Sequence, residues 1–339
     1  MRITVIGAGS WGTAIAGVAA ARAEQVTLWS FDPESVEGIN VRHVNPLYLA
    51  DYTLPDNVRA TGSYEEALEG ADGIIVVVPS PFLRATIHQA APYIKPETPV
   101  LTLTKGIEEH TGALMSEVVA SEIGNPERVA ALSGPNHAEE ICRGSLSAAV
   151  VAAPVPEVAE FFKNLLISPN FRIYLSDDMV GIETCAAVKN VMAIVCGIAA
   201  GVGYGDNTLA LIMTRGLAEI SRLVSARGGN PLTCMGLAGM GDLVVTCTSP
   251  HSRNRSFGVA FAQGESLEDY QARTHMIVEG AAAAKSTAEL ARTLGVDAPL
   301  TFVLERALYH GLGIEEALGI LQDRFPTEEF YGLTPTGRD

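Results

Sequence analysis

Residues 2–29 read RITVIGAGSWGTAIAGVAAARAEQVTLW. An apolar run at residues 2–6 leads into the glycine-rich segment GAGSWG, which opens a stretch of small residues with helical composition. A second apolar run follows at residues 26–29. This order predicts a strand, a glycine turn, a helix and a second strand.

The same alternation continues to about residue 180. Helices are predicted at residues 82–94 and 157–166. Short, almost continuously apolar runs predict further strands at residues 73–78, 99–104, 129–134 and 148–153. Strands that are apolar throughout and alternate with helices are typical of a doubly wound parallel sheet, because helices then cover both of its faces.

Beyond residue 180 the pattern changes to long helical segments. These are predicted at residues 181–203, 208–228, 256–263, 280–295, 300–310 and 314–323. The sequence therefore predicts an α/β fold class, with a Rossmann-type doubly wound parallel sheet in residues 1–180, an all-α domain in residues 181–330 and a tail at residues 331–339.

Composition narrows the function classes. The chain has 339 residues, of which 47% are hydrophobic and 18% charged, which suits about two domains with sizeable cores. Its formal net charge of −16 argues against broad nucleic-acid binding or anionic-membrane binding, so an anionic small substrate needs a local basic cluster. Met1 and Arg2 lead straight into a strand, without the features of a signal peptide, and we expect a cytoplasmic protein.

The five cysteines are odd in number and lack CxxC or His-rich spacing. We therefore expect neither a disulfide framework nor a metal site.

The glycine motif has the context that a dinucleotide site requires, since it follows a strand and opens a helix. Gly7 permits the tight turn, Gly9 lets the backbone approach a pyrophosphate, and Gly12 allows close packing of helix and strand. The helix N-terminus then faces the anion. The alternative, a purely structural glycine turn, is less consistent with this context.

The end of the second strand bears on the choice between NAD and NADP. It reads Trp29-Ser30-Phe31-Asp32-Pro33. Asp32 is placed either to bond the ribose hydroxyls of NAD or to cap the next helix. No arginine stands in this turn to meet the 2′-phosphate of NADP, and both cofactors remain open.

Lys189 stands within CAAVKNVMAIVCGIAAGVG, residues 185–203, which is otherwise almost wholly apolar or small. A buried ammonium is costly unless it is paired or needed, and a lysine in a dry pocket can act as a general acid or base. The alternatives are a lysine that snorkels to water and a transmembrane span. The span is the weaker one, because Lys189 and Asn190 interrupt it and it barely reaches about 20 residues.

Polar groups also follow strands in the first domain. Lys105 follows the strand at 99–104, at the kind of strand end where open α/β sheets bind ligands. Gly134 and Asn136 follow the strand at 129–134 and are placed to approach a substrate, whereas His137 is more often structural.

In the helical domain, Asp242 is preceded by glycines and followed by apolar residues. It is either a cap or the counter-charge of a buried lysine. Residues 246–255, TCTSPHSRNR, combine hydroxyls with Arg253, Asn254 and Arg255 just before a helical run. Arginine and the amides of a helix start suit a phosphate, although a solvated basic loop has the same composition.

With these residues in view, the chain resembles the bacterial NAD(P)-dependent glycerol-3-phosphate dehydrogenases along nearly its whole length. The matching motifs are GAGSWGTAIA, VTLWSFDP, NPLYLADYTLP (residues 45–55), VVVPS, TKGIE, SGPNHAEE, AAVKNVMAI, TRGLAEISR, GLAGMGDLVVTCTSPHSRNR and VEG. The chain departs from the family where Asn136 and His137 replace a hydroxyl residue and an aromatic residue. It also has Phe31 where many members carry Arg or His.

The resemblance implies roles for individual residues. Lys189 is the proton donor and acceptor, with Lys105 and Asp242 as further catalytic residues. The substrate residues are Lys105, Gly134, Asn136, Asn190, Asp242, Thr246, Ser252, Arg253 and Asn254. The cofactor residues are Gly7, Gly9, Ser10, Trp11, Gly12, Phe31, Lys105, Ala138, Arg253, Ile277 and Glu279.

The predicted function is the reversible reduction of dihydroxyacetone phosphate to sn-glycerol 3-phosphate with NADH or NADPH, which feeds glycerophospholipid synthesis. We expect a small phosphorylated substrate, a homodimer, no nucleic acid and no stable membrane insertion. One alternative is a related two-domain dehydrogenase acting on a hydroxy acid, since Arg253 would also bind a carboxylate. The other is a sensor that binds a nicotinamide dinucleotide without turnover.

Overall fold

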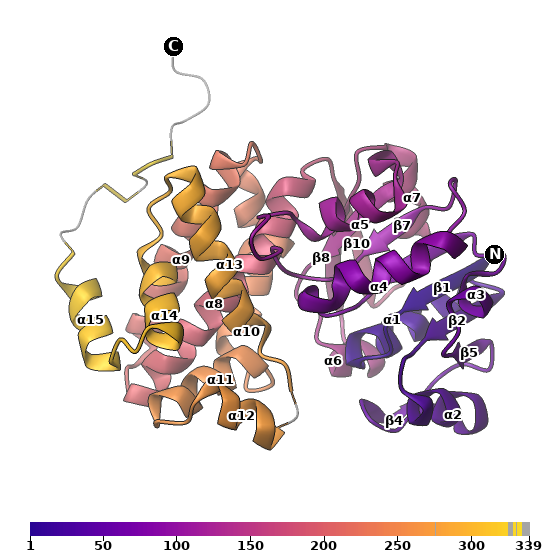
Figure 1. The fold of residues 1–339 in the computed structure, drawn as a ribbon, viewed down its shortest axis with the longest axis horizontal. Helices are drawn as coiled ribbons and strands as arrows, with labels where there is room; N and C mark the ends of the chain where they lie inside the picture. The colour runs from indigo at the N-terminus through magenta and orange to yellow at the C-terminus, as the bar shows by residue number, and fades with distance from the viewer. Residues whose placement is uncertain (275, 325–327, 330, 334–339) are drawn as a thin grey trace, which may run out of the picture. The chain divides into compact units, whose positions relative to one another are not determined.

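The computed structural model describes residues 1–274, 276–324, 328–329 and 331–333 (Figure 1). The chain forms two compact units, of which the first contains residues 1–105 and 115–179. The second contains residues 106–114 and the chain from Val180 onward. Most of the tail, residues 334–339, lies outside the described residues.

An eight-stranded sheet forms the centre of the first unit, in the order β10-β9-β8-β7-β6-β1-β2-β5. The strands are β1 (Arg2–Ile6), β2 (Gln25–Trp29), β5 (Val58–Thr61), β6 (Gly73–Val76), β7 (Val100–Thr102), β8 (Val129–Ser133), β9 (Ser147–Ala152) and β10 (Phe171–Ser176). The central strands β1 and β6 are buried almost throughout, which explains why they read as continuous apolar runs.

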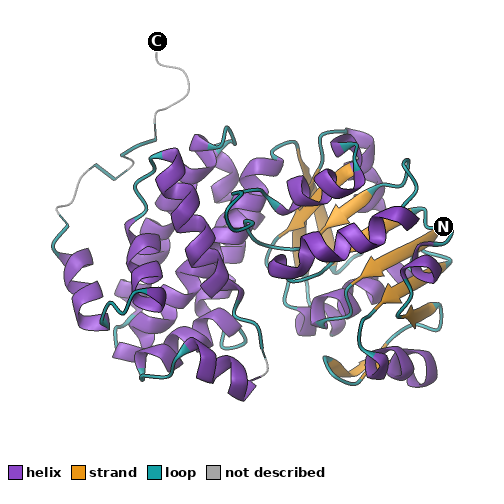
Figure 2. Cartoon of the chain, in the orientation of Figure 1, coloured by secondary structure: helices purple, strands orange, loops and turns teal. Residues whose placement is uncertain are grey.

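Helices cover both faces of this sheet (Figure 2). They are α1 (Ser10–Ala20), α2 (Pro33–Arg42), α3 (Tyr64–Leu68), α4 (Leu83–Ala90), α5 (Met115–Ile123), α6 (Ala138–Cys142) and α7 (Pro156–Leu166). Helices α4 and α5 pack against each other, and α1 packs with α6 and α7. A small antiparallel pair, β3 (Val44–Asn45) and β4 (Leu49–Thr53), follows α2.

The predicted doubly wound sheet is confirmed, with differences at its edges. Strand β9 pairs antiparallel with β8, so β9 and β10 run opposite to the other six strands. The edge strands β5 and β10 were not predicted, because buried and exposed residues alternate along much of each and leave no continuous apolar run. The β3–β4 pair was also missed, since its strands are short and largely polar or exposed.

The described part of the second unit is helical. Its helices are α8 (Met179–Val202), α9 (Asp206–Ala226), α10 (Asp242–Thr248), α11 (Arg253–Ala262), α12 (Leu267–Thr274), α13 (Glu279–Leu294), α14 (Pro299–Tyr309) and α15 (Ile314–Gln322). Two short helices were not predicted. Helix α10 follows a run of glycines, and α12 is mostly polar with a single buried residue, Tyr270.

Helix α8 is long and apolar enough to cross a membrane by length and composition alone. However, 72% of its most apolar 18-residue window is buried inside the structure. This burial is typical of a core helix, and it explains why α8 is apolar around its whole circumference.

Residues 106–114 were assigned by sequence to the first domain but group with the second unit. The physical reason is polar contacts to α9 and α13. Lys285 forms an ion pair with Glu109, the backbone N–H of His110 donates to Glu289, and Arg227 donates to the carbonyl of Gly112.

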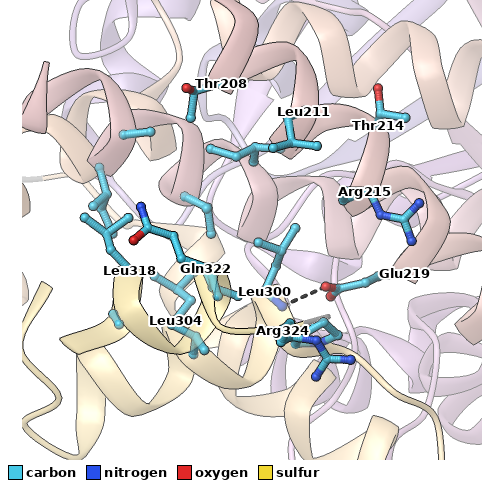
Figure 3. Close-up of a pocket in the computed structure, with 18 of the residues that line it drawn as sticks. Thr208, Leu211, Thr214, Arg215, Glu219, Leu300, Leu304, Leu318, Gln322 and Arg324 are labelled. Atoms are coloured by element: carbon cyan, nitrogen blue, oxygen red, sulfur yellow. Dashed lines mark hydrogen bonds between the residues drawn. The ribbon is translucent and has the colours of Figure 1, made fainter. Parts of the chain in front are cut away.

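Glu219 on α9 fixes the start of α14 (Figure 3). Its carboxyl group accepts hydrogen bonds from the backbone N–H of Leu300 at 2.7 Å and from the N–H and hydroxyl of Thr301 at 3.3 and 3.1 Å. Helix α14 has no side-chain cap of its own at Ala298, so Glu219 supplies the missing acceptor. Burial raises the pKa of Glu219 to about 7 despite these bonds.

This raised pKa predicts a pH-dependent stability. The folded chain keeps the Glu219 proton up to about pH 7, whereas an unfolded chain loses it near the ordinary value of 4.5. The folded state then binds more protons in this window, so the free energy of unfolding falls as pH rises from 4.5 to 7. In the parent, the free energy of unfolding should fall by about 3 kcal/mol across this range, as measured by chemical denaturation at each pH. We expect this fall to be absent in Glu219→Gln.

Glu160→Gln, at a partly exposed ion pair with Lys163, is the control and should keep the parental pH dependence. Parallel pH profiles for the parent and Glu219→Gln would contradict the assignment.

Candidate active site

The three glycines of the first turn differ in what requires them. Gly7 has a φ of +113°, and a Cβ there would lie 2.3 Å from the carbonyl oxygen of Val77. A Cβ on Gly12 would lie 1.8 Å from the carbonyl oxygen of Gly7. A Cβ on Gly9 would meet nothing within 4 Å. The fold therefore requires Gly7 and Gly12, whereas Gly9 leaves open space beside the turn.

The N-terminus of α1 fits the pyrophosphate of a dinucleotide. Gly9 is its N-cap, no side chain caps it, and its first turn carries no acidic residue. The backbone N–H groups of this end are thus available to an anion. Ser10 and Trp11 form the first turn, and the Trp11 ring packs edge-on against Phe171, with centroids 6.4 Å apart.

The turn after β2 shows Asp32 in the capping role. Its carboxylate accepts a hydrogen bond from the backbone N–H of Ser35 at 2.8 Å and caps α2. Hydrogen bonds from Ser35 lower the pKa of Asp32. Phe31 beside it is 81% exposed and free to contact a ligand. Asp32 thus acts as a helix cap.

Lys105 and Gly134 are brought together in the first unit. The Lys105 ammonium donates to the Gly134 carbonyl at 3.3 Å. Gly134 has a φ of +154°, and a Cβ there would lie 2.8 Å from the carbonyl of Ala148, so glycine is needed. Asn136 donates to the same Ala148 carbonyl at 3.0 Å, while its Oδ1 is buried without a partner.

Two neighbouring residues complete this part of the first unit. Ala138 is buried and begins α6. His137 occupies the N-cap position without a capping side-chain bond.

Lys189 is buried at the centre of the second unit and does not snorkel, being only 5% exposed. Its ammonium lies 3.0 Å from Asp242 Oδ1 and 2.9 Å from Thr246 Oγ1. Thr246 in turn donates to the backbone carbonyl of Asp242 at 2.6 Å. Helices α8 and α10 thus hold one cation, one anion and one hydroxyl in a buried cluster, an arrangement able to hold and move a proton.

Asn190 and Asn254 form a second cluster beside it. The Asn254 amide donates to Asn190 Oδ1 at 3.0 Å and accepts from the backbone N–H of Gly280 at 2.9 Å. Helix α13 has no side-chain cap at Val278, so Asn254 satisfies its N-terminus. The predicted cofactor residues Ile277 and Glu279 flank this point, Glu279 as the first residue of α13.

Ser252 and Arg253 form the start of α11. Ser252 is buried and accepts from the backbone N–H of Arg255, which makes it the N-cap. Arg253 is exposed at the first helical position. A guanidinium beside a helix N-terminus is suited to a phosphate. Ser252 and Asn254 already have partners, whereas Arg253 is an exposed cation beside this helix start, and the partly buried Arg255 has an Nε without a hydrogen-bond partner.

A cavity of about 930 Å³ in the second unit lies apart from these predicted residues. It is lined mainly by apolar side chains of α9, α14 and α15, and Glu219 is at its wall (Figure 3). Its lining includes none of the predicted site residues.

Two buried polar residues, Asn45 and Glu219, were not singled out from the sequence. Each falls within a motif of the resemblance, which was the available signal.

Comparison with known proteins gives the family. Residues 2–159 match the model described as NAD-dependent glycerol-3-phosphate dehydrogenase N-terminus, and residues 178–319 match the corresponding C-terminus. The chain is 41% identical over 335 residues to a glycerol-3-phosphate dehydrogenase (NAD(P)+) of Shouchella clausii, with 98% of each chain covered.

Solved structures agree. A glycerol-3-phosphate dehydrogenase from Coxiella burnetii is 38% identical, has a TM-score of 0.91 and is matched over 95% of this chain and 99% of that one. A ketopantoate reductase family protein from Ralstonia eutropha, matched over 91% of this chain and 97% of that one, is 16% identical with a TM-score of 0.60 and shares the fold alone. The chain therefore belongs to the NAD-dependent glycerol-3-phosphate dehydrogenase family.

Proposed function

We propose that this chain reduces dihydroxyacetone phosphate reversibly to sn-glycerol 3-phosphate, with Lys189 as the group that moves the proton. The observation that carries this assignment is the buried contact of Lys189 with Asp242 and Thr246 in a member of this family. Structural alternatives account poorly for a lysine that is paired inside a largely apolar helix.

A nicotinamide cofactor bound at this site would supply the hydride for the ketone carbon. The ketone oxygen, which develops negative charge, then takes a proton from the Lys189 ammonium. Lys189 regains a proton from solvent. Asp242 and Thr246 hold the Nζ atom in place through their contacts. The family resemblance also assigns Lys105 to this oxygen, where a second positive charge stabilises the transition state.

The phosphate end is assigned to Arg253 and the N-terminus of α11. Binding there orients the ketone, so energy from a remote contact supports the chemical step. Ser252, Asn190 and Asn254 shape this region through their hydrogen bonds. Gly134 and Asn136 are the proposed substrate residues of the first unit.

The cofactor is NAD or NADP, and we propose that Gly9 and the N-terminus of α1 bind its pyrophosphate. The residues 30–33 contain no lysine or arginine, which supports use of both cofactors. The other proposed contacts come from Ser10, Trp11, Phe31, Lys105, Ala138, Arg253, Ile277 and Glu279. The match to the family over nearly the full length disfavours both a hydroxy-acid dehydrogenase and a sensor without turnover.

We further propose a cytoplasmic homodimer whose product feeds glycerophospholipid synthesis. The product carries the phosphorylated glycerol skeleton of those lipids. Exposed apolar side chains such as Leu211, 60% exposed on α9, support a partner on the second unit.

Lys189→Met tests the proton-transfer role. This change keeps the length and apolar character of the stem but removes the acid and the charge. We expect kcat to fall at least about 100-fold, because general acid–base catalysis alone contributes about 10²–10⁴-fold. Cofactor binding, measured by titration, should survive, and single-turnover rates should fall with kcat.

Lys163→Met, at a partly exposed ion pair with Glu160, is the matched control and should keep parental activity. Should the unpaired Asp242 carboxylate destabilise Lys189→Met, the double variant with Asp242→Asn removes that buried charge. A folded Lys189→Met protein that keeps more than about a tenth of parental kcat would rule out the role.

Gly9→Ala and Gly12→Ala distinguish a glycine that leaves room for the cofactor from a glycine that the fold itself requires. At Gly9 the added methyl fits the chain but occupies the open side of the turn, so we expect a rise of at least about tenfold in the cofactor Kd with almost unchanged thermal stability. At Gly12 the methyl meets a backbone oxygen, and we expect a loss of about 1–3 kcal/mol or more in stability. An unchanged Kd for Gly9→Ala would place the pyrophosphate elsewhere.

Arg253→Ala tests the phosphate contact. Because a bidentate contact of this kind is made in both ground and transition states, KM for dihydroxyacetone phosphate should rise about 10- to 100-fold with a smaller change in kcat. Arg253→Lys should recover only part of the loss. Arg255→Ala is the comparison, and a rise in KM there without one in Arg253→Ala would move the contact to Arg255.

A further inference from the structure

Asn45 is a fully buried polar side chain with every hydrogen-bonding group engaged. It ends the short strand β3 and has 0% exposure. Its amide nitrogen donates to the Ala8 carbonyl at 2.7 Å and to Thr13 Oγ1 at 2.8 Å. Its amide oxygen accepts from Ser35 Oγ and from the backbone N–H of Leu47, both at 3.3 Å.

These partners fix which way the amide faces. The Ala8 carbonyl can only accept a hydrogen bond, and the Leu47 N–H can only donate one. The nitrogen of Asn45 must therefore face the glycine turn, and its oxygen must face the β3–β4 segment. A flipped amide would lose both contacts.

The bond to Ala8 sets the orientation of one peptide group in the glycine turn. No cis peptide bond occurs in the described residues, so the Ala8 carbonyl and the Gly9 N–H point in opposite directions. Because Asn45 holds that carbonyl toward the interior, the Gly9 N–H is directed away from Asn45. A Cβ on Gly9 would meet open space, as expected for the side that receives an anion.

Asn45 also reaches the turn after β2. The Ser35 hydroxyl donates to Asn45. The backbone N–H of Ser35 donates to Asp32, which lies in the turn after β2. The two turns that follow β1 and β2 are thus joined through one side chain. These are the turns that the cofactor motif assigns to the pyrophosphate and the ribose.

We propose that Asn45 is a positioning residue for cofactor binding, which keeps the Ala8–Gly9 peptide in the orientation that presents its N–H to the pyrophosphate. It acts through the glycine turn and does not itself touch the cofactor. Without Asn45, the buried Ala8 carbonyl loses its shorter hydrogen bond and keeps only the 3.5 Å bond from Thr13 Oγ1, so the Ala8–Gly9 peptide is held less firmly in this orientation. This inference rests on the proposed pyrophosphate site at Gly9 and the N-terminus of α1, concerns cofactor binding alone and is independent of the role of Lys189.

Asn57 provides a matched control. Its amide nitrogen also donates two hydrogen bonds, both to backbone carbonyls at the other end of the α1 region: Ala20 at 2.9 Å and Ala23 at 3.0 Å. The same substitution at Asn57 therefore removes the same type of hydrogen bond from the same segment of chain. It leaves the glycine turn unchanged.

The test compares Asn45→Asp with Asn57→Asp in the full chain. Aspartate keeps the shape of asparagine but replaces its N–H donors with an acceptor. We expect the Kd of NADH and of NADPH, titrated without substrate well below the unfolding temperature, to rise at least about tenfold for Asn45→Asp and to change less than about twofold for Asn57→Asp. At saturating cofactor, kcat and KM for dihydroxyacetone phosphate should stay within about threefold of the parent.

Asn45→Ala and Asn57→Ala are measured alongside, since they remove the donors without adding a charge. If Asn45→Asp does not fold, this pair decides the question by the same Kd comparison. Equal Kd values for the parent and a folded Asn45 variant, or an equal rise at Asn57, would overturn the proposal. A fall in kcat with unchanged Kd would also overturn it, and would leave the assignment of Lys189 untouched.

Discussion

The first unit depends on a contact between backbone and backbone that only glycine allows. A Cβ on Gly12 would lie 1.8 Å from the Gly7 carbonyl oxygen, and one on Gly7 would lie 2.3 Å from the Val77 carbonyl oxygen. Strand β1, helix α1 and the chain after β6 can therefore approach one another only if both side chains are absent. This approach sets the direction of α1 and places its uncapped N-terminus beside the open space at Gly9. The proposed anion site is thus a by-product of close packing.

The second unit is organised by the cost of burying a charge. Lys189 lies in a helix buried on nearly every side, and Asp242 and Thr246 on α10 stabilise its ammonium. Helix α10 begins directly after a glycine-rich segment in which a Cβ on Gly239 would lie 2.1 Å from the Cys234 carbonyl oxygen. The tight turn therefore places Asp242, at the start of α10, where it can neutralise the buried charge of Lys189. A chain that could not make this turn would leave Lys189 without its counter-charge.

The sequence predicted the elements whose residues are uniformly buried and missed those at boundaries. Strands β1, β6 and β8 were found because burial on both faces makes them continuously apolar, whereas β5 and β10 lie at sheet edges and alternate. The pairing of Lys189 with Asp242 was open from the sequence, because residues 53 positions apart can be paired only by the fold. The cap roles of Ser252, Asn254 and Asp32 were equally open. An asparagine or aspartate near a helix start looks the same in the sequence whether its side chain binds a ligand or caps the backbone.

The chain passes between its two units three times, at residues 105–106, 114–115 and 179–180. Neither unit is consequently a continuous piece of the sequence, and no single cut yields both intact. A gene fragment that ended at residue 179 would carry the segment 106–114 without Lys285, Glu289 and Arg227, to which it is bonded. A fragment that began at residue 180 would leave those side chains without partners. In evolution, replacing the second unit by a different domain would therefore require a matching replacement of the segment 106–114 as well.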